Sequence, residues 1–297
     1  MVRVLIVEGN TPELCAQRSE RSLPWAAESF GEALARFAPE LEVSVTRPMF
    51  SDYAPAEIPV ADVDGVVFTG SGVAWAADDT RARPYWELFE RAVAAERPVL
   101  GCCWGLQVGA VVLGGRVGAG PNGIETAVAR GLTLTEAGRA HPMHDGRSAA
   151  FDALCMHRDD VLVPPPGAVV TARNDHTEVQ GMVHEAAKFW GLQYHPEISV
   201  ADVANFLSRV SGAFEASYPA HAAEATDYAR IAADPEGTAD LQARLDLHEG
   251  LTDPWRHGVE LANWLQTALG TRVHRAAPDR ICHDRPLSRG APPPAPS

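Results

Sequence analysis

The chain has 297 residues, of which 46% are hydrophobic, enough for one large α/β domain and an additional segment. Its 39 acidic and 25 basic residues give a formal net charge of −14, which disfavours phosphate backbones and anionic membrane surfaces. Five cysteines without a paired Cys-x-x-Cys spacing exclude a disulfide framework or a zinc knuckle. No apolar run reaches the roughly 20 residues of a membrane span, so we expect a cytoplasmic protein with no nucleic-acid or membrane partner.

Short apolar strands alternate with amphipathic helices in the first hundred residues. Residues 2–7 form a β-branched run with little alternation, as in a strand buried on both faces of a parallel sheet. The elements expected next are a helix over 25–37, strands over 41–45 and 64–70, a helix over 81–96 and a strand over 98–101. This alternation predicts an α/β fold with a three-layer, doubly wound, mostly parallel sheet, in which sites lie beyond the carboxyl ends of the strands.

The strand over 98–101 leads into a cysteine that is bracketed by glycines. Cys103 has Gly101 two residues before it and Gly105 two residues after it, the frame of a strand-turn-helix nucleophile elbow. A helix expected over 106–113 would point its N-terminus at the sulfur and favour the thiolate. Cys102 lacks this frame, so we interpret it as a small buried apolar residue. Tight packing of a strand against a helix is the alternative explanation of the glycines.

A second apolar strand ends in His195, Pro196 and Glu197. Pro196 prevents a regular helix at this point, so His195 and Glu197 project to the same side of an extended chain. The carboxylate can then hold the far nitrogen of the imidazole. With Cys103, these residues supply a nucleophile, a base and an acidic group that orients the base, the set required for an acyl-transfer triad.

A glycine turn follows the strand over 64–70, at a position from which backbone N–H groups can face the elbow. We assign Gly70 and Ser71 to an oxyanion hole, with the amide of Trp104, directly after the nucleophile, as the second donor. Taken alone, this turn is explained as well by a plain strand-helix connection.

The pattern changes after residue 114. Glycines and prolines then separate short runs such as 128–134 and 168–172, which predicts a mixed β region between 114 and 184. A helix is expected over 199–210, with Ser199 and Asp202 as a capping pair.

Beyond about residue 214 the chain is Ala-rich and acidic, with scattered helical signals. The clearest helix runs from a cap at Asp253 to a stop at Gly270. Its apolar residues must be buried against the core or a partner. We therefore divide the chain into a main domain over 1–212, a helical appendage over 213–280 and a Pro-rich, disordered tail over 281–297.

Gly-x-Cys-x-Gly-x-Gln at 101–107 and His-Pro-Glu at 195–197 are two well-separated motifs in a fixed order. With them, the chain resembles the class I glutamine amidotransferases, the triad glutaminases of the GMP synthase and anthranilate synthase type. Residues 156–159 resemble the Trp-His-x-Asp stretch of that family with Met in place of Trp, and 122–125 resemble its Gly-Arg-Glu segment with Ile124 in place of Arg. The resemblance covers roughly residues 3–210 and implies the flavodoxin-like glutaminase fold.

The resemblance also implies a reaction. Cys103 would attack the side-chain amide of glutamine, His195 would carry the thiol proton to departing ammonia, and water would hydrolyse the glutamyl thioester. Gln107, with Gly72, would contact the substrate. No cofactor or metal is implied, and the sequence contains no phosphate-binding Gly-x-x-x-x-Gly-Lys-Ser/Thr loop. A separate ammonia-accepting enzyme is therefore a possible partner.

Two alternatives stay open at this point. The protein could act alone as a γ-glutamyl hydrolase of peptides or amines, because such hydrolases share the fold and the triad. It could also be a binding or regulatory module that keeps the fold without turnover, although the intact set of Cys103, His195 and Glu197 argues against this.

Overall fold

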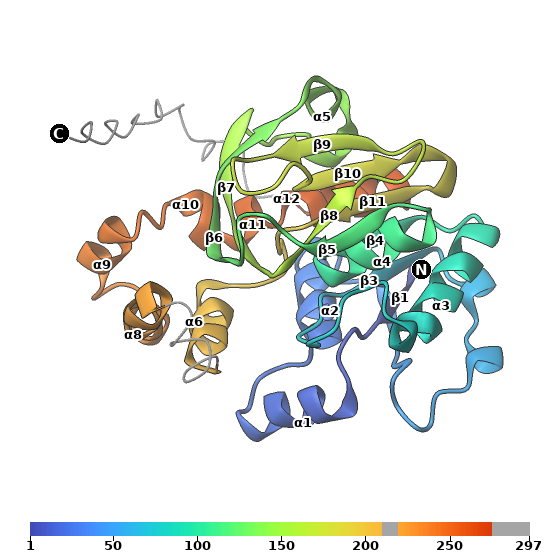
Figure 1. Ribbon diagram of the computed structural model, residues 1–297, viewed down its shortest axis with the longest axis horizontal. Helices are drawn as coiled ribbons and strands as arrows, with labels where there is room; N and C mark the ends of the chain where they lie inside the picture. The colour runs from blue at the N-terminus through green and yellow to red at the C-terminus, as the bar shows by residue number, and fades with distance from the viewer. Residues whose placement is uncertain (210–218, 275–297) are drawn as a thin grey trace.

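A computed structural model describes residues 1–209 and 219–274 (Figure 1). The strands are β1 (Arg3–Val7), β2 (Glu42–Thr46), β3 (Gly65–Phe68), β4 (Val99–Cys102), β5 (Arg116–Ala119), β6 (Glu125–Leu134), β7 (Ala150–His157), β8 (Asp159–Val163), β9 (Val169–Arg173), β10 (Gly181–His184) and β11 (Phe189–Leu192). The main helices are α1 (Pro12–Glu20), α2 (Ala26–Phe37), α3 (Arg83–Ala94), α4 (Trp104–Val112), α5 (Glu136–Ala140), α6 (Val200–Arg209), α8 (Pro219–Ala233), α9 (Ala239–Arg244), α10 (Glu249–Thr252), α11 (Pro254–His257) and α12 (Val259–Asn263).

All of these strands except β5 and β8 form one large mixed sheet in the order β2-β1-β3-β4-β11-β10-β9-β6-β7, and β5 and β8 pair with each other in a small antiparallel sheet. From β2 to β11 neighbouring strands are parallel, and from β11 to β7 they are antiparallel. The antiparallel part is the mixed β region expected from the sequence. In the parallel part, β4 lies between β3 and β11, with Gly101 opposite Phe68 on one side and Gly191 on the other. The strands that precede the glycine turn, the cysteine and the histidine are therefore adjacent.

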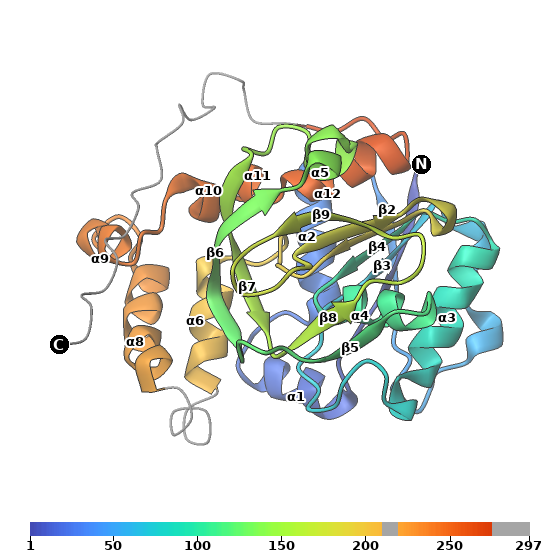
Figure 2. The same ribbon diagram turned by 45° about the horizontal axis from the view of Figure 1, so that its top comes forward.

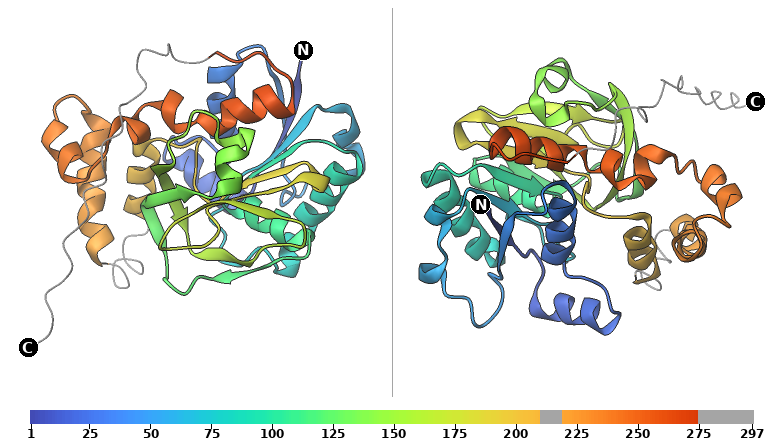
Figure 3. Two further views of the ribbon diagram at one scale, coloured as in Figure 1. Left: turned by 90° about the horizontal axis from the view of Figure 1, so that it is seen from above. Right: turned by 180° about the vertical axis from the view of Figure 1, so that it is seen from behind.

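Helices cover both faces of the parallel half, which gives the predicted three layers. On one face α3 and α4 bury residues such as Phe89 and Leu106 against β3, β4 and β11. On the other face α2 packs beside α12, as the view from behind shows (Figure 3). The apolar side chains there include Phe30 of α2 and Ile6 of β1. The predicted α/β fold with additional C-terminal helices is confirmed.

A third core lies outside β6 and β7, where α6, α8 and α10 stand beyond the antiparallel edge (Figure 2). Val203 and Leu207 of α6 and Ile231 of α8 are buried there against Leu154 of β7. The capping pair predicted for α6 is present, because Ser199 and Asp202 exchange hydrogen bonds between side chain and backbone. Residues 210–218, where the expected boundary between main domain and appendage falls, lie outside the described residues.

The helix expected from Asp253 to Gly270 is broken. The Asp253 side chain caps it as predicted, by accepting a hydrogen bond from the amide of Trp255. However, α11 ends at His257, α12 begins at Val259, and a π-helical turn covers Trp264–Ala268. Arg147 explains the break, because its guanidinium donates to the carbonyl oxygens of Arg256 and His257, which a continuous helix would have used itself. The tail over 281–297 lies outside the described residues.

Helices α1 and α5 were not expected from the sequence. Helix α1 has only Cys15 buried, so it lacks the apolar stripe that marks an amphipathic helix. A side-chain cap from Thr11 and a proline at its first position begin it instead. None of the helices in 1–209 and 219–274 is long and apolar enough to cross a membrane.

Candidate active site

Cys103 sits in strained backbone at the carboxyl end of β4. Its φ of 51° and ψ of −111° are unfavourable for a residue with a Cβ, and it forms the N-cap of α4. The flanking glycines permit this turn: a Cβ on Gly101 would lie 2.6 Å from the carbonyl oxygen of Gly105, and one on Gly105 would lie 2.2 Å from that of Phe68. Cys102, by contrast, is fully buried in the core beside α2, as the sequence predicts.

The sulfur of Cys103 lies where strand and helix meet. The side chain is nearly buried, and its thiol donates a hydrogen bond of 3.3 Å to the carbonyl oxygen of Met156. Trp104 is the first residue of α4, so its amide has no acceptor within the helix. The N-terminal end of the helix dipole stabilises negative charge at this position. Cys103 therefore lies at the N-terminal end of the α4 dipole, directly before the Trp104 amide.

His195 follows the adjacent strand β11 and pairs with Glu197. The imidazole Nδ1 and the Glu197 Oε1 are 2.7 Å apart, and both side chains are nearly buried. Burial lowers the pKa of His195, but the negative charges of Glu197 and Cys103 outweigh burial and hold that pKa well above its ordinary value. A Cβ on Gly70 would lie 2.8 Å from His195 Cε1 and 3.5 Å from the Cβ of Cys103. Gly70 therefore lies beside both the cysteine and the histidine.

The glycine turn is held in place from the end of β1. The amide of Gly72 donates to the side-chain oxygen of Asn10 at 2.9 Å, and the amide of Val73 donates to the Ser71 hydroxyl at 3.3 Å. Asn10 is itself fixed by Glu8, whose carboxylate accepts hydrogen bonds from both the amide and the side chain of Asn10. The amide of Gly72 is thus used to shape the turn, while its role as a substrate contact stays a prediction.

Loss of this support is expected to slow catalysis. In Asn10→Ala the glycine turn loses its anchor without losing any group that would touch substrate. Since a displacement of about 1 Å can cost up to 100-fold, we expect kcat to fall about tenfold with a small change in the melting temperature. Steady-state kinetics and thermal unfolding measure the two effects. Unchanged kcat would show that the turn holds its shape without Asn10.

Gln107 is buried on α4 and its side chain is used inside the protein. Its NH2 group donates to the carbonyl oxygen of Asp159 at 2.6 Å and to the side chain of Gln193 at 3.2 Å. These contacts tie α4 to β8 and to the segment after β11. A contact with substrate therefore remains a prediction for Gln107, with its donors already occupied in this structure.

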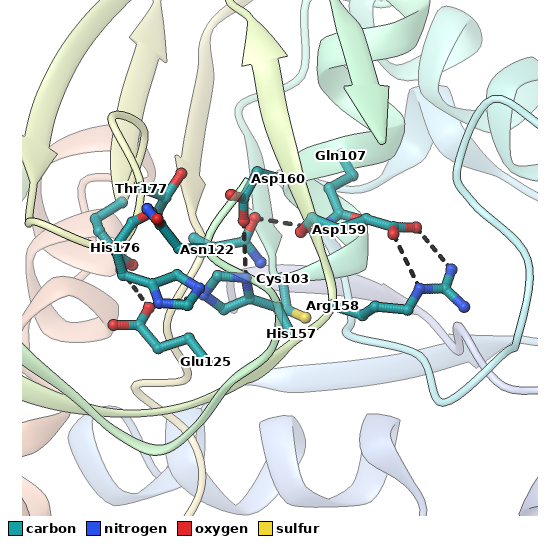
Figure 4. A network of polar contacts seen from close by, with 12 residues as sticks. Cys103, Gln107, Asn122, Glu125, His157, Arg158, Asp159, Asp160, His176 and Thr177 are labelled. Carbon is teal, nitrogen blue, oxygen red and sulfur yellow. Dashed lines mark hydrogen bonds and ion pairs between the residues drawn. The ribbon is translucent and has the colours of Figure 1, made fainter. Parts of the chain in front are cut away.

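A second histidine lies close to the cysteine in a buried polar network (Figure 4). His157 Nε2 is 2.8 Å from Glu125, and its Nδ1 is 3.0 Å from Asp160. Burial lowers the pKa of His157, but the two carboxylates outweigh burial and raise that pKa to about 9. His157 is therefore a buried cation that lies near Cys103 (Figure 4). The sequence alone does not reveal these two acidic partners of His157.

The described part of the chain contains no group of three or more His, Cys, Asp or Glu side chains arranged to hold a metal ion. The four cysteines within it are all free thiols. Asn10 and His157 were not among the predicted site residues. The Trp-His-x-Asp resemblance is the one signal that could have directed attention to His157.

Comparison with known proteins agrees with this geometry. The family model for glutamine amidotransferase class-I matches residues 26–207, a span that includes the glycine turn, the elbow and the His-Pro-Glu segment. The chain belongs to the class-I glutamine amidotransferase family.

Individual relatives differ in how much of the chain they match. A γ-glutamyl-L-1-hydroxyisopropylamide hydrolase from a Pseudomonas species is 33% identical over 279 residues, which cover 89% of this chain and 92% of the relative. One subunit of the glutamine-hydrolysing GMP synthase from Methanopyrus kandleri is 34% identical over 152 residues, which cover 50% of this chain and 79% of the relative. A solved glutamine amidotransferase from Methylobacillus flagellatus has a TM-score of 0.59 at 21% identity over 95% of this chain and 98% of that chain, and so shares the fold.

Proposed function

We propose that the protein hydrolyses a γ-glutamyl amide through a thioester on Cys103. The observation that carries the proposal is the convergence of three strand ends: β4 presents Cys103 in strained backbone, β11 leads to the His195–Glu197 pair, and β3 leads to Gly70 beside both. A nucleophile, a proton carrier and backbone donors are what an acyl-enzyme route needs.

In this mechanism each group has one task. The thiol proton passes from Cys103 to His195, whose raised pKa holds it on the imidazole, and the resulting thiolate attacks the amide carbon of the γ-glutamyl group. Backbone amides of Gly70, Ser71 and Trp104 stabilise the oxyanion, a contribution of roughly 3 kcal/mol for each well-placed donor. His195 then protonates the leaving amine, and the C–N bond breaks. The same histidine activates water, which cleaves the thioester, releases glutamate and regenerates the thiol.

An N-substituted γ-glutamyl amide is the first candidate substrate. The similarity to the hydrolase named for γ-glutamyl-L-1-hydroxyisopropylamide extends over 89% of this chain, including the C-terminal helices, whereas that to the GMP synthase protein covers 50%. Glutamine is the second candidate, with ammonia delivered to a separate enzyme. The membership in the glutamine amidotransferase family favours it.

A product assay tests this proposal. The purified protein is incubated with γ-glutamyl isopropylamide, a γ-glutamyl dipeptide or glutamine, and glutamate, amine and ammonia are quantified by mass spectrometry. We expect glutamate and amine from the N-substituted substrates at a rate that Cys103→Ala abolishes. Hydrolysis of glutamine alone would favour the second candidate. No turnover, together with no labelling of Cys103 by a thiol-reactive glutamine analogue, would overturn both and favour a binding module.

Glu197→Gln is expected to lower kcat by about 1,000-fold, because the amide cannot stabilise the imidazolium that forms at His195. His195→Gln should lower kcat further, since the proton carrier itself is then lost. Steady-state kinetics on the three proteins check this order. Wild-type activity of Glu197→Gln would contradict the pairing and show that another group holds His195. Asp159 is the first group to test in that case, although Arg158 donates to both of its carboxylate oxygens.

A further inference from the structure

The C-terminal segment, residues 254–268, contacts the backbone of His195. The ring of His257, at the end of α11, places its Nε2 2.7 Å from the carbonyl oxygen of His195. The two residues are 62 positions apart in the sequence. His257 is 2% exposed, so this contact is shielded from solvent.

The protonation state of His257 follows from its surroundings. Burial lowers the pKa of His257 to about 4, and the positive charge of Arg147 acts in the same direction. The ring is therefore neutral near pH 7 and carries one proton. A carbonyl oxygen only accepts hydrogen bonds, so that proton resides on Nε2 and is donated to His195.

The backbone of His195 has few other means of support. β11 ends at Leu192, and Pro196 has no N–H group with which to continue a hydrogen-bond ladder. The amide of His195 donates to the carbonyl oxygen of Leu154 on β7 at 2.9 Å. With the donor from His257, the residue is held on both sides, once through its N–H and once through its C=O.

His257 is itself held by a buried ion pair. Arg147 donates to the carbonyl oxygen of His257 at 2.9 Å and pairs with the fully buried Glu260. Glu260 also accepts a hydrogen bond of 2.9 Å from the hydroxyl of Tyr194, the residue before His195. The successive residues Tyr194 and His195 thus bond to Glu260 and His257 of the C-terminal segment. Arg147 contacts both Glu260 and His257 and so holds these two residues together.

We propose that His257 is a positioning residue for the reaction: by donating to the His195 carbonyl it fixes the backbone from which the imidazole reaches Cys103 and Glu197. The C-terminal segment then helps to set the geometry of the active site. This inference rests on the proposed function, in which His195 moves protons for Cys103.

Two substitutions of His257 form a matched pair. His257→Gln places an amide N–H about as far from the backbone as the ring Nε2, whereas His257→Asn carries the same group one methylene shorter. Leu261→Val, in the same segment and fully buried, is the control for a loss of packing without a change in hydrogen bonding. For each protein kcat, KM and the melting temperature are measured with the best substrate of the product assay.

A second measurement is independent of turnover. The rate at which iodoacetamide alkylates Cys103 near pH 6.5, followed by peptide mass spectrometry, depends on how well the His195 imidazolium stabilises the thiolate. We expect His257→Asn to lower both kcat and the alkylation rate about tenfold with little change in KM, as for a misplaced catalytic group. His257→Gln should restore both to within about twofold of the wild type.

Two outcomes would overturn the inference. The first is equal kcat and alkylation rates for His257→Gln, His257→Asn and the wild type. The second is a decrease in kcat and in the alkylation rate that lower stability alone explains. In that case Leu261→Val would be as slow as His257→Asn when the two variants have the same melting temperature. If the wild type hydrolyses no γ-glutamyl amide, the proposed function fails, but the alkylation rates still decide whether His257 positions His195.

Discussion

Cys103→Ala is expected to lower the rate of γ-glutamyl amide hydrolysis by at least about 10⁴-fold, because no other group can form the thioester. Cys103→Ser should be nearly as slow, since a hydroxyl is a far weaker nucleophile beside a histidine than a thiol. The fold should survive both changes, because the side chain is presented by strained backbone at the edge of the core. Glutamate release and thermal unfolding check the two statements.

The adjacent cysteine supplies the control. Cys102 lies in the apolar core on the face covered by α2, and burial holds the pKa of its thiol well above the ordinary value. Such a thiol stays protonated and unreactive. Cys102→Ala should therefore keep most of the activity and lose a little stability. The reverse result, with Cys102→Ala inactive and Cys103→Ala active, would show that the elbow is placed one residue away from its true position.

The two halves of the sheet were not equally predictable. Strands β1, β3 and β4 are buried on both faces, so each is a continuous apolar run that the sequence displays directly. In the antiparallel half, bulges interrupt the registers of β6 with β7 and of β9 with β10. No period of two residues continues through such positions, and the sequence therefore predicts a mixed β region without its strand order.

The residues of the candidate active site were also not equally predictable from the sequence. Cys103 is marked by glycines two residues away, and Glu197 lies two residues from His195, so both features are local in the sequence. Asn10 and His257 are different, because each bonds to a residue 62 positions away that only the folded chain brings near. Their own neighbours in sequence carry no sign of a role. A single sequence therefore identifies the groups proposed to react and misses those that hold them in place.

A chain that ends after residue 212 is expected to lose its cooperative fold. Trp264 and Leu265 are fully buried in the same core cluster as Ile6 and Leu192, so their removal exposes the face of the sheet that α2 and α12 cover. Each large apolar side chain contributes about 1.5–3 kcal/mol, against a typical total stability of about 5–15 kcal/mol. Size-exclusion chromatography and thermal unfolding measure the result.

The ion pair that this truncation removes can be tested in the full-length chain. Glu260 is fully buried, and Arg147 holds the pKa of its carboxyl far below the ordinary value although burial opposes this. Glu260→Leu leaves the Arg147 charge buried and unpaired, which should cost about 3–5 kcal/mol, whereas adding Arg147→Met removes that charge and should recover much of the loss. Chemical denaturation of both variants measures the difference. Two results would show that residues 254–268 are not an integral part of the core. The first is a double variant that is no more stable than the single one. The second is a truncated chain that is monodisperse and melts like the full-length protein.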